Sequence, residues 1–233
     1  MDSYVVGEEM LTISVINHII QEERQLLLGS ESKKRILASR DFLDKKIKFS
    51  DKPFYGINTG FGSLCDIEIE NNDLEQLQKN LVISHACGTG DHVPQEVVKI
   101  MLLLKIVSLS KGYSSVQLET VERLVEMFNK GVIPVVFQQG SLGASGDLAP
   151  LAHLSLPLIG EGKVFFGGKI KEAKAVLKVN SWTPIKLQSK EGLALLNGTQ
   201  FMSSYGVWNL IKAQKLSYIA DMIGAISVDA FDG

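Results

Sequence analysis

The segment at residues 140–150, with the sequence GSLGASGDLAP, restricts the local fold more than any other part of this chain. It spaces Gly140, Gly143 and Gly146 three residues apart and combines them with small Ala and Ser side chains. Glycine tolerates positive φ angles and close backbone approach, so the segment can bend more tightly than an ordinary loop. Pro150 suits a first helical turn, which predicts a tight bend leading directly into a helix.

The centre of this segment, Ala144-Ser145-Gly146, carries the atoms needed for an internal cyclisation. In a tight turn the amide nitrogen of Gly146 can approach the carbonyl carbon of Ala144, because glycine has no Cβ to shield that nitrogen. Closure would give a five-membered imidazolone, and loss of water from Ser145 would leave an exposed methylidene group. Such a group is an electrophile, for which enzymes usually depend on a cofactor. An ordinary small-residue loop is the alternative interpretation of this tripeptide.

Composition limits the class of protein. The chain has 233 residues, is 45% hydrophobic and carries a formal net charge of −2, which suits one large or two small globular domains. Without a basic bias there is no support for binding nucleic acid or an anionic membrane. The apolar runs are too short to span a bilayer, and the first residues do not resemble a signal sequence. Cys65 and Cys87 form no CxxC pair, so we expect free thiols and a cytoplasmic location. The histidines and cysteines show no metal-ligand spacing.

Hydrophobic periodicity predicts a mainly α-helical chain. The expected helices cover residues 14–27, 31–46, 73–85, 94–111 and 114–131, the last opened by a capping box of Ser114 and Gln117. Residues 132–139 are expected to be extended, and residues 163–170 to form a small β-hairpin that turns at two glycines. Thr199 is expected to cap one long helix that reaches toward Ala230 and leaves an apolar face uncovered.

Three further segments have small or polar residues where a helical protein normally has hydrophobic ones. They are residues 55–62 (YGINTGFG), 84–90 (SHACGTG) and 197–200 (NGTQ). Tyr55 lies in a glycine-rich loop, His85 at the end of a helix, and Asn197 just ahead of a helix. A packing anchor, a helix cap favoured by the helix dipole and a turn residue are the structural alternatives for the three. His153 is expected to be buried and hydrogen-bonded near the glycine-rich bend.

Together with residues 140–160 and 191–200, these segments resemble the aromatic amino acid ammonia-lyases, and within them the histidine-specific branch. The resemblance implies the N-terminal part of a fumarase/aspartase-like helical fold. It implies an N-terminal helical domain at 1–110 and the start of a central helical domain at 111–233. Because it covers only about the first half of such an enzyme, we expect an incomplete and inactive fragment. The full-length family members are homotetramers that share active sites between subunits.

The resemblance also implies how the electrophile forms and where it lies. Ala144, Ser145 and Gly146 match the tripeptide that cyclises to 4-methylideneimidazol-5-one, with no metal and no external cofactor. Asp147 matches the acidic residue that follows this tripeptide. Asn197 matches the amide near the carbonyl of the electrophile.

The remaining matched residues imply a substrate. Tyr55 matches the tyrosine that removes the β-proton, or assists that step, and His85 matches the histidine that contacts the substrate ring. The polar pair Ser84-His85 suits an imidazole, whereas tyrosine- and phenylalanine-specific members resemble His-Leu and Phe-Leu here. The implied reaction is non-oxidative elimination of ammonia from L-histidine to give trans-urocanate. Whether the electrophile captures the amine or the ring stays open.

Other functions remain as alternatives. They are a tyrosine or phenylalanine ammonia-lyase, an aminomutase of the same family, and a folded fragment without catalytic activity. A serine hydrolase would need a G-x-S-x-G elbow, which the sequence around Ser145 does not provide. A nucleotide-binding site is not supported either, because neither a complete dinucleotide fingerprint nor a phosphate-binding GxxxxGK[ST] loop occurs.

Overall fold

The computed structural model describes residues 3–49, 54–59, 73–142 and 146–233 and is mainly helical, as the sequence predicts. Its helices, in chain order, are α1 (Ile13–Gln21), α2 (Ser30–Lys48), α3 (Leu74–His85), α4 (Gln95–Ser110), α5 (Leu118–Asn129), α6 (Leu148–Ser155), the 3₁₀ helix η3 (Leu156–Ile159), α7 (Ala173–Val179), α8 (Glu191–Leu196) and α9 (Gln200–Ala230). Its short strands are β1 (Ser3–Val6), β2 (Gln25–Leu28), β3 (Thr89–His92), β4 (Ile133–Pro134), β5 (Phe137–Gln139), β6 (Lys163–Phe166) and β7 (Lys169–Glu172).

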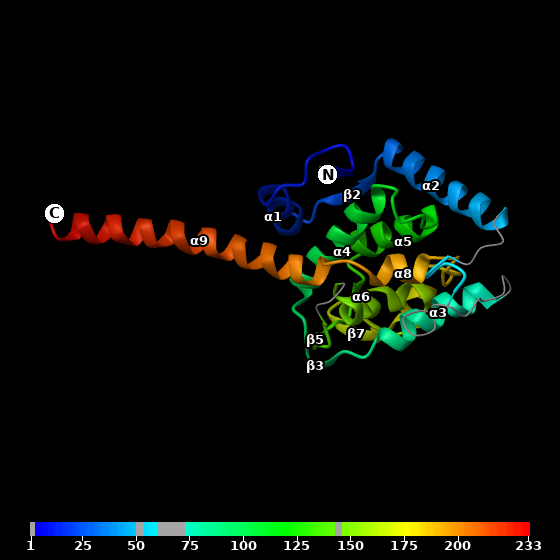
Figure 1. Ribbon diagram of the computed structural model, residues 1–233. Coiled ribbons are helices and arrows are strands. Elements are labelled where there is room, and N and C mark those ends of the chain that lie inside the picture. The colour runs from blue at the N-terminus through cyan, green and yellow to red at the C-terminus, as the bar shows by residue number, and fades with distance from the viewer. Residues whose placement is uncertain (1–2, 50–53, 60–72, 143–145) are drawn as a thin grey trace.

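Helix α4 lies at the centre of the fold. Its side chains from Ile100 to Leu103, together with Ile106, are fully buried, in agreement with the nearly continuous apolar sequence of this helix. The helix packs against α1, α2, α5 and the first turns of α9 (Figure 1). One charged side chain, Lys105, is buried with these apolar residues. Helix α4 therefore joins the N-terminal helices α1 and α2 to α5 and to the start of α9.

The predicted helix over residues 14–27 is wrong beyond Gln21. The chain turns at Glu23, which has a φ of 51°, and continues as strand β2, parallel to β1. The backbone of Leu26 is held on its other side by Asn129 of α5, whose side chain accepts from its N–H (2.8 Å) and donates to its carbonyl (2.9 Å). These distant partners satisfy the backbone that a longer helix would have satisfied locally.

The β-hairpin predicted at residues 163–170 is confirmed and extends to Glu172. Strands β6 and β7 pair antiparallel around the Gly167-Gly168 turn, and β4 adds a third strand to the sheet. A separate two-stranded pairing joins β3 to β5. This second pairing matters for the site, because β3 follows His85 in the chain and β5 precedes the glycine-rich bend.

Helix α9 confirms the predicted long helix but not its expected cap. The Thr199 side chain makes no capping hydrogen bond. The same holds for the capping box at Ser114 and Gln117, since no side chain of the N-cap residue bonds the start of α5. In both places a carboxylate from elsewhere in the chain accepts a hydrogen bond from a backbone amide at the start of the helix.

Beyond its first turns α9 projects away from the rest of the chain (Figure 1). Apolar side chains along the projecting part are exposed, including Leu216, Ile219 and Ile223, which confirms the expected uncovered face. Within the described residues, no helix combines the length and the apolar character needed to cross a membrane. The division into domains at 1–110 and 111–233 stays a prediction.

Candidate functional site

The structure brings the glycine-rich bend against the segment that contains Asn197. Gly146 and Gly198 form an isolated parallel bridge, and the Asp147 amide donates to the Gly198 carbonyl at 2.8 Å. Gly146 has a φ of 125°, and a Cβ at this position would overlap the Gly198 carbonyl. Only glycine therefore allows the two backbones to lie this close. Ala144 and Ser145, the other two residues of the predicted cyclising tripeptide, lie outside the described residues.

The side chain of Asp147 also holds the contact between Gly146 and Gly198 in place. Its buried carboxylate accepts from the Ser141 hydroxyl at 2.8 Å and from the Met202 amide at 2.9 Å. The Met202 amide belongs to the first turn of α9, where helix N–H groups have no partner within the helix. Asp147 thus supplies the cap that the sequence assigned to Thr199. It also lies immediately before α6, so the N-terminal ends of α6 and α9 meet beside Gly146.

The segment around His85 is the second neighbour of the bend. Strand β3 pairs with β5 through Thr89 and Gln139. A Cβ on Gly140 would lie 3.0 Å from the Cα of Gly88, so the two backbones are nearly in contact. The Gly88 amide donates to Nε2 of His153 at 3.0 Å, which confirms that His153 is a buried, hydrogen-bonded residue of α6. Burial lowers the pKa of His153, which agrees with an unprotonated Nε2 that accepts.

His85 is the last residue of α3 and is only partly buried. Its Nδ1 lies 2.9 Å from the Leu81 carbonyl, which has no proton to give, so Nδ1 carries the proton. In the neutral ring Nε2 is then the acceptor. Ser84 is exposed and its hydroxyl donates to the same carbonyl at 3.1 Å. Both side chains therefore bond the Leu81 carbonyl at the helix end, and Nε2 of the neutral His85 ring is left as an acceptor.

Tyr55 lies in a compact turn that follows α2. The Asn58 side chain accepts from the Phe54 amide at 2.6 Å, and the Thr59 hydroxyl accepts from the Gly56 amide at 3.2 Å. Both bonds tighten the backbone on either side of Tyr55, whose side chain is 58% exposed. The placement of Tyr55 beside the electrophile stays a prediction.

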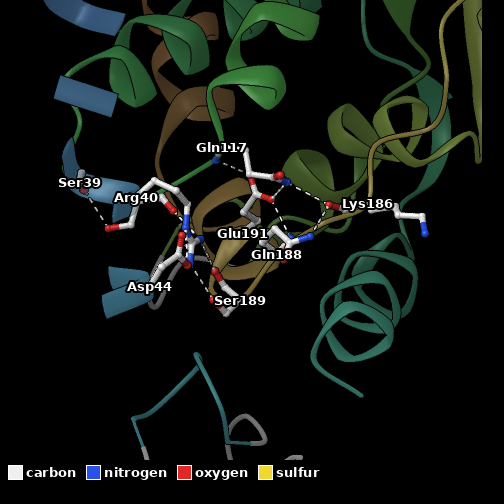
Figure 2. Close-up of polar contacts among 9 residues, drawn as sticks. Ser39, Arg40, Asp44, Gln117, Lys186, Gln188, Ser189 and Glu191 are labelled. Atoms are coloured by element: carbon white, nitrogen blue, oxygen red, sulfur yellow. Dashed lines mark hydrogen bonds and ion pairs between the residues drawn. The ribbon is translucent and has the colours of Figure 1, made fainter. Parts of the chain in front are cut away.

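Asn197 is exposed and follows the short helix α8. Sequence reasoning missed what holds this helix. Glu191, at its start, is completely buried and accepts four hydrogen bonds. The donors are the Gln117 amide (2.8 Å) and side chain (2.6 Å), the Thr120 hydroxyl (2.7 Å) and the Gln188 amide (2.8 Å). Figure 2 shows Glu191 between Gln117 and Gln188. The carboxylate also replaces the expected capping box at the start of α5.

A neighbouring cluster holds the turn before α8. The buried Arg40 of α2 donates to the carbonyls of Ser115 (2.8 Å) and Ser189 (2.9 Å) and to the Ser189 hydroxyl, and it pairs with Asp44 (Figure 2). The Gln78 side chain of α3 accepts from the Gly192 amide at 2.8 Å. At the far end of α8, Lys105 of α4 donates to the carbonyls of Ala194 and Asn197. Side chains from four other helices thus fix α8 and the residues that follow it.

The described residues hold no group of three or more His, Cys, Asp or Glu side chains placed to bind a metal ion. The arrangement instead combines the contact between Gly146 and Gly198, the N-termini of α6 and α9, and the imidazole of His153. Helix N-termini carry partial positive charge, which favours any negative charge that develops near Gly146.

The family model for aromatic amino acid lyases matches residues 11–233. The chain belongs to the aromatic amino acid lyase family. A curated member of this family, the histidine ammonia-lyase of Caldanaerobacter subterraneus subsp. tengcongensis, is 44% identical over 233 residues, which is 100% of this chain and 46% of that protein. The histidine ammonia-lyase of Bacillus subtilis is 45% identical over 223 residues, covering 96% of this chain and 44% of that protein. This chain therefore spans about half the length of these relatives.

Solved structures of the lyase family share the fold. The histidine ammonia-lyase of Trypanosoma cruzi superposes with a TM-score of 0.88 at 38% identity, over 97% of this chain and 44% of that one. The tyrosine aminomutase of Streptomyces globisporus superposes with a TM-score of 0.82 at 33% identity, over 88% of this chain and 38% of that one. The helical fold implied by the sequence resemblance is thus confirmed.

Proposed function

We propose that this chain carries the electrophile-forming part of a histidine ammonia-lyase, which releases ammonia from L-histidine and leaves trans-urocanate. The observation that carries the proposal is the contact of Gly146 with Gly198, with Asp147 bonded to both sides of it. In this contact Gly146, the last residue of the tripeptide that we propose to cyclise, lies against the segment that contains Asn197. The identity of about 45% to curated histidine ammonia-lyases favours histidine as the substrate.

The residues present fit an imidazolone formed from Ala144, Ser145 and Gly146. Gly146 has a positive φ, and there is no room for a Cβ between it and Gly198. The space at this position therefore accommodates backbone atoms only. When formed, the 4-methylideneimidazol-5-one supplies an electrophile that withdraws electrons from the substrate. The N-terminal ends of α6 and α9 would stabilise negative charge on the cyclised backbone.

The other residues would bind the substrate and move its proton. The Nε2 acceptor of His85 suits an imidazole N–H of the substrate, and Ser84 provides a second polar group at the same helix end. Tyr55, which is more than half exposed, would take the β-proton once the substrate is bound. The Asn197 side chain, just before Gly198, would orient the electrophile carbonyl.

Activity requires more than this chain in our proposal. The curated relatives are about twice as long, so about half of such an enzyme lies outside the 233 residues. We expect this chain alone to be inactive or nearly so, and to act within a cytoplasmic homotetramer when the rest of the enzyme is present. The exposed apolar face of α9 is consistent with burial in a larger assembly.

Intact mass spectrometry tests the electrophile directly. Cyclisation and dehydration remove two water molecules, so the mass of a matured chain falls by that amount and a near-ultraviolet band appears. Ser145→Ala must abolish both changes. Ser217→Ala, which alters an exposed serine on α9, must leave them intact. An unmodified mass in a longer, active form of the protein would refute the proposed chemistry.

An aminomutase is the second candidate, because a tyrosine aminomutase shares 33% identity with this chain. Product analysis separates the two. A lyase releases ammonia and an unsaturated acid, whereas an aminomutase returns a β-amino acid with the nitrogen retained. Preference for tyrosine over histidine in a substrate panel would favour this second candidate.

A further inference from the structure

Lys105 is a buried cation that the proposed chemistry does not use. It lies in the middle of α4 with 1% of its surface exposed, among fully buried apolar side chains. Burial lowers the pKa of its ammonium to about 7, because water no longer solvates the charge. Among the described residues no carboxylate lies within ion-pair distance of it. A lysine in such a place costs free energy unless its N–H groups bind something specific.

The acceptors of Lys105 are backbone carbonyls at the end of α8. Its Nζ donates to the Ala194 carbonyl at 2.7 Å and to the Asn197 carbonyl at 3.1 Å. The last carbonyls of a helix have no partner within the helix and form the negative end of its dipole. A cation is therefore well matched to this position, and its side chain joins α4 to the residue that begins the site segment.

The chain of contacts continues to Gly146, the last residue of the proposed electrophile. Asn197 adopts an extended conformation (φ −87°, ψ 128°), and Gly198 follows with a φ of 148°. The Gly198 carbonyl then accepts the Asp147 amide, and Gly198 bridges to Gly146. The carbonyl that Lys105 binds and the carbonyl that accepts from the Asp147 amide thus belong to consecutive residues, Asn197 and Gly198.

We propose that Lys105 is a positioning residue that holds the Asn197-Gly198 backbone in register with Gly146. It acts through Asn197 and does not touch the reacting atoms. Its importance for catalysis rests on the proposed lyase function, but its effect on the backbone does not. The neutral amine of lysine also donates hydrogen bonds, so the role depends on N–H groups and correct length rather than on charge alone.

Amide hydrogen exchange in this chain tests the backbone role. Lys105→Met keeps the length of the side chain but removes its donors. Exchange of the Asp147 amide is expected to accelerate about tenfold or more, as for the loss of a charge-assisted hydrogen bond, relative to amides of the β6–β7 hairpin. Lys99→Met is the matched control, because Lys99 lies on the same helix with its ammonium over the Phe128 ring. Lys99→Met should leave the exchange rate of the Asp147 amide, relative to the amides of the β6–β7 hairpin, unchanged.

Several outcomes would overturn the proposal. Equal acceleration at Asp147 and in the hairpin would indicate only global destabilisation, and no acceleration would show that Lys105 holds nothing. If Lys105→Met does not fold, Lys105→Gln replaces it, because its amide donates but is too short to reach both carbonyls. Wild-type protection of Asp147 in that variant would likewise contradict the proposal.

A catalytic readout separates this proposal from the lyase assignment. In a longer, active form of the protein, Lys105→Met should lower kcat by about tenfold or more while KM changes little, because misplacing the backbone beside Gly146 weakens stabilisation of the transition state without weakening substrate binding. If the wild-type protein neither cyclises nor releases ammonia, the lyase proposal fails while the exchange result stands. If it does both and Lys105→Met matches it in kcat and Asp147 protection, only the Lys105 proposal fails.

Discussion

Replacing Glu191 by glutamine should destabilise the protein strongly although the two side chains have nearly the same shape. Each carboxylate oxygen accepts two hydrogen bonds, from Gln117, Thr120 and Gln188. In Glu191→Gln one oxygen becomes an NH₂ group that faces N–H donors. At least one backbone amide, that of Gln117 or that of Gln188, then loses its acceptor inside a fully buried site.

The size of the effect follows from these contacts. A hydrogen bond to a charged group contributes about 1.5–3 kcal/mol, and an orphaned buried donor costs a similar amount, so we expect a loss of ~3 kcal/mol in the free energy of unfolding. For a chain of this size that corresponds to a Tm lower by about 6–12 °C.

Urea unfolding followed by far-ultraviolet circular dichroism measures the change, with Glu75→Gln as the control. Glu75 is an exposed residue in the first turn of α3, and its replacement should cost ~0.5 kcal/mol or less. A loss for Glu191→Gln no larger than that of the control would show that the buried carboxylate does not hold α8 as argued.

Three further substitutions probe the site. Gly146→Ala should prevent cyclisation and cost ~2 kcal/mol or more, because its φ is 125° and its Cβ would overlap the Gly198 carbonyl; normal water loss by mass would contradict this. Asp147→Ala should cost ~1–2 kcal/mol in urea unfolding, since the Met202 amide and the Ser141 hydroxyl both lose their acceptor, and an unchanged midpoint would refute the capping of Met202. His153 has a folded pKa below its ordinary 6.5, so the unfolded chain binds more protons between these values and stability falls as pH drops through that window. His153→Asn should remove this part of the pH dependence, at most ~1.4 kcal/mol per pH unit, and identical slopes for the two proteins would show that His153 is not the group responsible.

The sequence predicted the features that depend on local pattern. The buried helix α4, the β6–β7 hairpin and the long helix α9 are confirmed because their periodicity and turn glycines act over short distances. The segments around His85, Gly146 and Asn197 were singled out by their unusual composition, and the structure brings the glycine-rich bend against both of the other two segments.

What was missed depends on contacts between distant residues. Strand β2 has apolar residues that also fit a helix, and only pairing with β1 and Asn129 decides the matter. The cap of α9 comes from Asp147, 55 residues before Met202, rather than from the adjacent Thr199. Lys105 sits in an apolar run, and its acceptors lie 89 and 92 residues further along the chain. No local signal reveals such partners.

The six-residue length of α8 has a consequence for the order of events during folding. Helices shorter than about 12 residues are marginal on their own in water, so α8 persists only after α2, α3, α4 and α5 have docked their side chains on it. Under the proposed chemistry, ring closure has to wait for that docking. The rate at which the near-ultraviolet band of the cyclised group appears would then report how fast α8 docks during the last stage of maturation.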